Sequence, residues 1–430
     1  MQVERGERFW QALRELARKR LERAARSRQL GLGVQPMSES RGRIYFFANG
    51  IFADQISGGD IHFFHMAQAA MDAGYTVHFF GGHALEKQLR ANLKGYELTL
   101  TDSAQAKPFN ANSFFGQFRL LFDYFRRFMG TLRVMGKIDR TEIAYAVSDY
   151  WFDVLPVVLS RAKRKLMIWH MAAPSFWQIV RKGRPDVDST RVASFYYWIS
   201  QNLSILFFRF CRDKHLFIVH PDMRSWVRRL GYREEEVSYI SFGVDSERAA
   251  RVPPQEKIYD AVWIGRVHRQ KGIDDLLATL MHLSKTVKDF RAVLIGNLRE
   301  LQPRIESMGL ANCVKFSGFV SEDEKFRLFH ASRVFLMTSR FEGSPRVVAE
   351  SLVCNVPVVA YDVETYRPIF GEYLRYVKCF DVDAFKVESK NIICHVRGGK
   401  NYLLQVDPNS FCRMHSWEKT GAAFLTTVNS

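Results

Sequence analysis

Short apolar runs alternate with longer amphipathic stretches along most of the chain. In the first half, the apolar runs lie at 43–48, 75–80, 96–100, 143–147, 166–169, 215–219 and 237–240. A second series lies at 261–264, 292–295, 314–316, 334–337 and 356–361. This alternation predicts parallel sheets with helices on both faces. We therefore expect an α/β protein with two Rossmann-like domains.

Two carboxylates, Glu342 and Glu350, stand eight positions apart near the end of the second series. Ser344 is a favourable N-cap and Pro345 suits the first helical position, so a helix is expected to begin between the two acids. The free N–H groups at a helix start favour phosphate. A phosphate flanked by hydroxyl-binding carboxylates is the polarity pattern of a sugar nucleotide. The alternative is a capped amphipathic helix with two surface acids.

A basic loop lies upstream of this segment. An apolar run ends at Gly265, and Arg266 and Lys271 follow before a helix that is expected to begin near Ile273. Open α/β sheets bind ligands at the carboxyl ends of their strands. Two cations there could neutralise a diphosphate that leaves as a glycosidic bond breaks. The alternative is a solvated loop, since the chain has 62 Lys and Arg residues.

Together the two segments resemble the motifs of retaining GT-B glycosyltransferases of the family-4 type, the glycosyl transferases group 1. Glu342 and Glu350 match the Glu-x7-Glu motif, and 265–272 matches the Gly-Arg-x4-Lys-Gly motif. The resemblance covers about 43–428 and is strongest from 240 to 370. It implies the GT-B fold, in which two Rossmann-like domains face each other across a cleft.

The resemblance also implies roles for individual residues. Glu342 would contact the donor sugar and Glu350 the ribose, while Arg266 and Lys271 would bind the diphosphate. His170, which follows a strand, would lie at the reaction centre, so the implied catalytic set is Glu342, His170, Arg266 and Lys271. The other implied donor-binding residues are Gly58 and Gly59 in a turn, Gly318, Phe319 and Val320 at the base, and Gly343, Ser344, Pro345 and Arg346 beside Glu342.

The implied reaction moves a sugar from a UDP-sugar or GDP-sugar to an acceptor hydroxyl with retention of configuration. The departing phosphate would take the proton of the acceptor. The chain has no Asp-x-Asp motif in a suitable loop, so we expect neither a metal ion nor a cofactor. His62 and His65 could in principle share a metal, but an ordinary helix surface or core is favoured because no further ligand completes the set.

The formal charge of +17 predicts an anionic partner. The basic residues are dispersed and form no recognised nucleic-acid-binding motif, which argues against nucleic acid. Residues 113–135 and 191–212 combine aromatic residues with Arg, as in Phe125-Arg126-Arg127-Phe128. Such faces suit an anionic membrane surface, although packed helices with solvated Arg side chains are the alternative. The first 28 residues read as a basic amphipathic helix that would lie on a bilayer or on its own domain.

The expected location is cytoplasmic, either free or peripheral on the cytoplasmic face of the membrane. The first residues are charged, no apolar run is long enough to span a bilayer, and the six cysteines form no CxxC pair. The expected acceptor is a glycan or a lipid-linked sugar.

The expected organisation has four parts. Residues 1–41 are an extension and linker, 42–243 an acceptor-side domain, 244–410 a donor domain, and 411–430 a helix that crosses back to the first domain. Two other interpretations stay open: a GT-B epimerase or phosphorylase, and a basic nucleic-acid-binding protein without enzymatic activity.

Overall fold

The structure is a computed structural model that describes two compact units. The described residues are 41–51, 58–102, 114–170, 176–177, 180, 191–253, 255–340, 342–400, 411 and 413–430. The amino-terminal unit comprises the described residues of Pro36–Gly243 together with Trp417–Ser430, and the carboxyl-terminal unit those of Val244–Ser416. The expected helix in the first 28 residues lies outside the described part.

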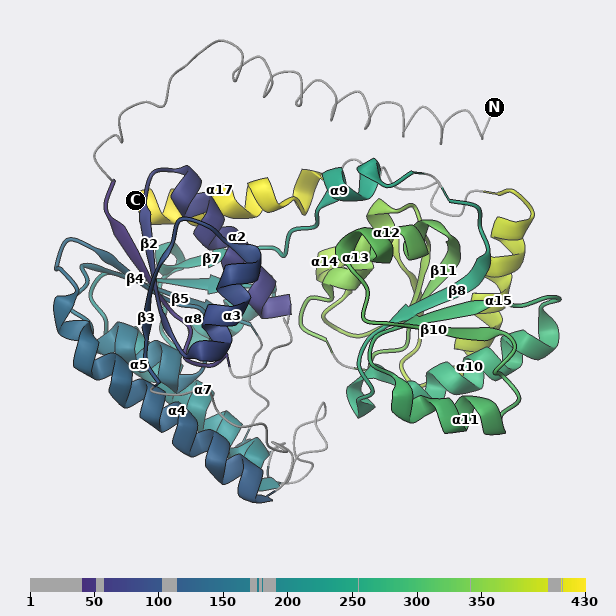
Figure 1. The fold of residues 1–430 in the computed structure, drawn as a ribbon, viewed down its shortest axis with the longest axis horizontal. Helices are drawn as coiled ribbons and strands as arrows, with labels where there is room; N and C mark the ends of the chain where they lie inside the picture. The colour runs from purple at the N-terminus through teal and green to yellow at the C-terminus, as the bar shows by residue number, and fades with distance from the viewer. Residues whose placement is uncertain are drawn as a thin grey trace, which may run out of the picture. The chain divides into compact units, whose positions relative to one another are not determined.

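The amino-terminal unit is built on a seven-stranded parallel sheet in the order β3-β2-β1-β4-β5-β6-β7 (Figure 1). Its strands are β1 (Arg43–Phe47), β2 (Thr76–Gly81), β3 (Glu97–Leu100), β4 (Ile143–Ala146), β5 (Arg164–Trp169), β6 (Lys214–Ile218) and β7 (Val237–Tyr239). Its helices are α2 (Gly58–Asp72), α3 (His83–Asn92), α4 (Phe114–Val134), α5 (Trp151–Leu159), α7 (Arg191–Arg209), α8 (Met223–Arg229) and α17 (Trp417–Asn429), with short turns η1 (Met135–Lys137) and η2 (Glu234–Glu236).

The central strands of this sheet are buried on both faces, as a parallel sheet covered by helices requires. Four of the five residues of β1 are buried. Helix α17 joins this core although it ends the chain: Phe424 is fully buried and lies against Phe46 and Tyr145. Gly421 allows α17 to approach α2 closely, because a Cβ there would lie 2.8 Å from the Cβ of Ala69.

The carboxyl-terminal unit has a six-stranded parallel sheet in the order β10-β9-β8-β11-β12-β13. Its strands are β8 (Tyr259–Ile264), β9 (Ala292–Ile295), β10 (Val314–Gly318), β11 (Ser332–Met337), β12 (Val358–Tyr361) and β13 (Arg375–Val377). Its helices are α9 (Ser246–Arg251), α10 (Ile273–Thr286), α11 (Gln302–Ser307), α12 (Glu322–His330), α13 (Arg346–Val353), α14 (Arg367–Phe370) and α15 (Val382–Arg397), with turns η3 (Arg269–Lys271), η4 (Arg299–Leu301) and η5 (Gly371–Tyr373).

The predicted α/β class and the two Rossmann-like domains are confirmed. Each predicted strand is present, with ends that differ by a residue or two. Strand β13 was not predicted, because it has three residues and its side chains are only partly buried.

The predicted start of the helix after Glu342 is wrong by one residue. Helix α13 begins at Arg346, so Pro345 takes the N-cap position and Ser344 lies outside the helix. The Pro345 carbonyl accepts the first turn bond from Val348 N, at 3.0 Å. A serine caps only from the position next to the first helical residue, which Ser344 does not occupy.

No helix in the described part of the chain is long and apolar enough to cross a membrane.

Candidate functional site

The Gly-Arg-x4-Lys-Gly segment forms the tight connection between β8 and α10. Gly272 ends η3 and precedes α10 in the left-handed region, with φ of +61°. A Cβ at Gly272 would lie 2.1 Å from the Thr338 carbonyl oxygen, so a side chain there would force the loop away from β11. The glycine of the motif is therefore a packing requirement of this loop.

Hydrogen bonds hold this loop against the end of β11. Thr338 Oγ1 donates to the Lys271 carbonyl at 2.8 Å, and Trp263 Nε1 donates to Thr338 Oγ1 at 3.1 Å. Arg340 N donates to the Gln270 carbonyl at 2.8 Å. Because β8 and β11 are neighbours in the sheet, both loops leave the same carboxyl edge.

The two sequence motifs meet through one ion pair. Lys271 Nζ lies 2.5 Å from Glu342 Oε1, and both side chains are largely buried, with 17% and 14% of their surfaces exposed. Thr365 Oγ1 donates to the Glu342 carbonyl at 2.7 Å and fixes the backbone there. The structure thus brings together two of the predicted catalytic residues from segments 71 positions apart.

A buried carboxylate anchors the loop that carries Glu342. Asp275, in the first turn of α10, accepts two-pronged hydrogen bonds from Arg340, with distances of 2.8 to 3.1 Å. Tyr361 donates to the same carboxylate at 3.0 Å, and burial, with the Asp275 charge next, raises the pKa of Tyr361. The sequence analysis missed this anchor, because an acid in the first turn of a helix is common and carries no distinctive signal.

The second carboxylate of the motif is buried with two cations. Lys325 Nζ lies 2.8 Å and Arg346 Nε 3.1 Å from Glu350 Oε1. Burial favours a raised pKa for Glu350, but the charges of Arg346 and Lys325 outweigh it and hold that pKa below its ordinary value. Glu350 Oε2 is buried and has no hydrogen-bond partner in the described part of the protein. It is the oxygen of this carboxylate whose hydrogen-bonding capacity the described residues leave unused.

Lys325 is a site residue that sequence reasoning missed. It belongs to α12, is 4% exposed, and also contacts Glu322 at 2.8 Å. Its partner Glu350 lies 25 positions away, and no motif links the two. The only available signal was a lysine next to Phe326 on a partly apolar helix.

The remaining predicted residues of this unit lie along the same sheet edge. Arg266 follows β8, is exposed, and makes no ion pair with any described residue. Gly318 ends β10 with φ of +69° and nothing near its Cβ direction, and its carbonyl accepts from Gly296 N at 2.9 Å. Phe319 is exposed and Val320 half-buried, while Gly343 and Ser344 are half-buried between Glu342 and α13. The structure does not bring Gly318, Phe319 or Val320 into contact with the Lys271–Glu342 pair.

The predicted residues Gly58, Gly59 and His170 belong to the amino-terminal unit. Gly58 and Gly59 are the first residues of α2, and His170 directly follows β5. Burial lowers the pKa of His170 to about 4, so its ring is neutral at pH 7. Its Nε2 atom is buried without a partner among the described residues.

The ring of His62, one turn into α2, lies in the core of this unit. It packs edge-on against Phe242 at 5.0 Å, and neither ring nitrogen has a described partner. Burial, followed by the charges of His170 and His65, lowers the pKa of His62 to about 3. His65 instead stacks on Trp417 at 3.9 Å. Within the described residues no group of three or more His, Cys, Asp or Glu side chains could hold a metal ion.

The carboxyl edge of the second sheet therefore presents cations and carboxylates in fixed positions. Arg266 and Lys271 offer positive charge at the end of β8, and Glu342 and Glu350 offer oxygens on either side of the α13 start. Such an arrangement can bind a ligand that is anionic in its middle and hydroxylated on both sides.

Comparison with known proteins relates one part of the chain to a family. Residues 245–393 match the family model of the glycosyl transferases group 1. The match spans most of the carboxyl-terminal unit. The match includes Arg266, Lys271, Glu342 and Glu350, and it leaves the amino-terminal unit outside.

Curated relatives resemble this chain at low identity. This chain is 25% identical over 289 residues to mannosylfructose-phosphate synthase of Agrobacterium fabrum. The alignment covers 60% of this chain and 63% of that protein. The chain is 25% identical over 179 residues to alpha-galactosylglucosyldiacylglycerol synthase of Streptococcus pneumoniae, covering 38% of this chain and 48% of the relative. The chain therefore matches about half of the length of these relatives.

Solved structures share the fold of both units. The Anabaena protein HepE, solved in complex with UDP and glucose, superposes with a TM-score of 0.64 at 15% identity, covering 90% of this chain and 99% of that one. The sucrose-phosphate synthase of Thermosynechococcus elongatus gives a TM-score of 0.67 at 15% identity, covering 90% and 98%. These likenesses establish the GT-B architecture of the chain.

Proposed function

We propose that the protein is a retaining glycosyltransferase that moves a sugar from a nucleotide-sugar to an acceptor hydroxyl. The observation that carries this proposal is the Lys271–Glu342 pair, which joins the two motifs at one sheet edge. The nucleotide diphosphate would lie against Arg266, Lys271 and the start of α13. The buried, unpartnered Oε2 of Glu350 supports an assignment to the ribose hydroxyls.

The charge balance of the site suits a departing diphosphate. When the glycosidic bond breaks, negative charge develops on the phosphate oxygen, and Arg266 and Lys271 stabilise it in place of a metal ion. Glu342 binds a hydroxyl of the donor sugar and holds Lys271 in position. His170, which is neutral, offers a hydrogen bond to the sugar rather than a charge, and Gly58 and Gly59 let backbone N–H groups approach the donor.

The proposed donor is a UDP-sugar or a GDP-sugar. The HepE structure supports the uridine nucleotide, since HepE was solved with UDP. The loop of Gly318, Phe319 and Val320 would receive the base. The proposed acceptor is a glycan or a lipid-linked sugar, and the name of the pneumococcal relative, a diacylglycerol glycolipid synthase, supports the lipid.

A nucleotide-release assay tests the donor assignment. With a panel of UDP- and GDP-sugars, we expect slow hydrolysis of at least one donor in water and faster release when an acceptor is present. The product should keep the anomeric configuration of the donor, measured from the coupling constant of the anomeric proton. An inverted product, or release from no donor, contradicts the proposal.

We further propose that the enzyme works on a membrane surface through α4. Phe118, Phe122, Phe125 and Met129 are exposed at helical spacing and form an apolar stripe along this helix, and Arg119 lies beside it. Apolar side chains flanked by Arg are favourable in the headgroup zone of anionic lipid.

The structure corrects one part of the predicted lipid-facing surface. Arg127 was expected to be exposed beside Arg126, but it is 3% exposed and forms an ion pair with Asp102. Phe128 packs against Trp151 at 5.3 Å. Adjacent residues of a helix point about 100° apart around its axis, so Arg126 and Arg127 face different directions and Arg127 is the one that faces the sheet.

Vesicle sedimentation tests this surface. Wild-type protein should bind phosphatidylglycerol vesicles at low salt and leave them at high salt, because screening weakens charge attraction. Phe122→Glu should lower the partition coefficient by about tenfold or more, since burying one Phe contributes about 1.5–3 kcal/mol. Val387→Glu, at an exposed apolar position of the other unit, is the matched control. Equal binding by both variants contradicts the assignment to α4.

A further inference from the structure

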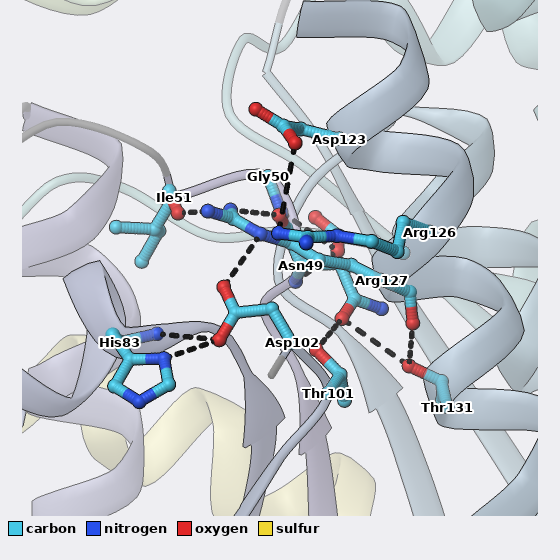
Figure 2. A network of polar contacts seen from close by, with 11 residues as sticks. Asn49, Gly50, Ile51, His83, Thr101, Asp102, Asp123, Arg126, Arg127 and Thr131 are labelled. Carbon is cyan, nitrogen blue, oxygen red and sulfur yellow. Dashed lines mark hydrogen bonds and ion pairs between the residues drawn. The ribbon is translucent and has the colours of Figure 1, made fainter. Parts of the chain in front are cut away.

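A buried polar network occupies the carboxyl edge of the first sheet, outside the residues assigned to the donor. Figure 2 shows side chains from the ends of β1, β2 and β3 converging with α4. Thr101 and Thr131 both donate to Asn49 Oδ1, at 2.9 and 3.2 Å. Such a network lies at the edge where α/β sheets bind ligands.

The centre of the network is a buried ion pair. Arg127 Nε lies 3.1 Å from Asp102 Oδ2, and the two side chains are 4% and 1% exposed. Arg127 Nη1 also donates to the carbonyls of Asn49 and Ile51, at 2.9 and 2.5 Å. These bonds hold the guanidinium rigidly and leave Asp102 Oδ1 for another donor.

That donor is His83, the first residue of α3. Its Nδ1 lies 2.5 Å from Asp102 Oδ1, and its backbone N–H donates to the same oxygen at 3.2 Å. An ionised carboxylate only accepts hydrogen bonds, so Nδ1 carries the proton. The other ring nitrogen, Nε2, can then pair with a hydroxyl, and Figure 2 shows that nitrogen turned away from Asp102. The side chain is 29% exposed, so part of the ring is accessible to a ligand.

Two glycines allow the network to form. A Cβ at Gly82 would lie 2.2 Å from Asp102 Oδ2 and 2.8 Å from Arg127 Nε. A Cβ at Gly130 of α4 would lie 2.1 Å from the Thr101 carbonyl oxygen. The absence of side chains at these two glycines lets Asp102 reach both Arg127 and His83. Asp102 then holds the His83 ring in place, as hydrogen bonds from neighbouring residues orient metal-binding and catalytic histidines.

We propose that His83 binds the acceptor, through a hydrogen bond between Nε2 and a sugar hydroxyl. This inference rests on the proposed glycosyl transfer and adds an acceptor subsite to it. Strand β2 is three strands from β5 in the sheet order, so His83 lies about 14 Å along the edge from His170 at a spacing of roughly 4.8 Å per strand. His83 would therefore hold a part of the acceptor one or more sugar units away from the reacting hydroxyl.

Two substitutions separate acceptor binding from a structural role. His83→Asn keeps an N–H near the position of Nδ1 for Asp102 but lacks any group near Nε2. His83→Gln places an amide near Nε2 instead. If His83 only connects α3 to Asp102, His83→Asn should have the acceptor KM of the wild type and His83→Gln should not. If His83 binds the acceptor, His83→Gln should be the variant closer to wild type. Arg90→Ala, at an exposed position of α3, is the control.

The assay uses n-octyl glycosides of mono- and disaccharides as acceptor probes, with donor hydrolysis in water measured in parallel. We expect His83→Asn to raise the KM for the best probe at least tenfold, with unchanged donor hydrolysis and melting temperature. His83→Gln should recover part of that loss. Direct binding of the same probe is read from the His83 ring signals of isotope-labelled protein, assigned with the variants.

The outcomes distinguish this subsite from the proposed function. Wild-type acceptor KM in His83→Asn, or His83 ring signals that do not shift with the probe, would overturn the assignment of His83 while leaving the transfer reaction intact. Absence of donor hydrolysis in the wild-type protein would instead overturn the proposed function.

Discussion

Lys271→Ala is expected to lower sugar transfer by about a hundredfold while the protein stays folded. Removing one preorganised group that stabilises transition-state charge commonly costs this much in turnover. Both side chains of the ion pair with Glu342 are largely buried, so the stability of the variant is measured together with its turnover. Turnover is measured by nucleotide release with saturating donor, and folding by the melting temperature.

Arg266→Ala should produce a loss of similar size, because Arg266 would contact the same diphosphate. Arg266 has no ion-pair partner in the described chain, so its removal leaves no charge uncompensated. Arg304→Ala removes an exposed cation that pairs with Asp274 in the same unit and serves as the control. Rates within twofold of wild type in both Lys271→Ala and Arg266→Ala would remove the diphosphate from this edge.

The fold and the first layer of the candidate site could be predicted because their signals are local. Apolar runs of three to six residues separated by amphipathic stretches predict a parallel sheet, and this pattern located every strand except β13. Arg266, Lys271, Glu342 and Glu350 stand at fixed spacing on strand–loop–helix units, and that spacing is what the motifs record. The sequence predicted that these residues act together, and the structure adds the 2.5 Å contact between Lys271 and Glu342.

The supporting residues could not be predicted because their partners are distant in the chain. Lys325 meets Glu350 only because α12 packs beside α13, and Asp275 meets Arg340 only because β8 and β11 are neighbours. Arg127 was misread for the same reason: helical periodicity shows that one side of α4 is buried but not which arginine faces Asp102. Pairings between distant elements follow from topology rather than from spacing.

Lys325→Met should destabilise the protein strongly, because it leaves Glu350 buried with Arg346 as its one remaining cation. Breaking a buried ion pair by removing one partner costs about 3–5 kcal/mol. The melting temperature of the carboxyl-terminal unit should fall by several degrees or more. Arg327→Met, which removes an exposed ion pair on the same helix α12, should have little effect.

The same cluster predicts a pH dependence. The folded pKa of Glu350 lies below its ordinary value of 4.5, so the carboxylate contributes stability above pH 4.5 that is lost as the pH falls through the folded pKa. Below pH 4.5 the wild-type protein should therefore lose stability faster than Glu350→Gln, measured by urea denaturation at several pH values. Parallel curves for the two proteins would show that the carboxylate is not stabilised by its cations.

A double substitution separates the structural role of the cluster from ligand binding. Lys325→Met with Glu350→Leu removes the buried pair, leaves Arg346 as the remaining charge of the cluster, and should restore part of the stability lost in Lys325→Met alone, because apolar replacement of a buried pair is often neutral. If Glu350 binds the ribose, the stable double variant should still bind free nucleotide at least tenfold more weakly than wild type, measured by calorimetry. Wild-type nucleotide affinity in the double variant would limit Glu350 to a structural role and place the ribose elsewhere.

The other carboxylate of the motif should behave differently. Glu342→Gln should keep the affinity for free nucleotide and reduce sugar transfer, because the proposed contact of Glu342 is the donor sugar.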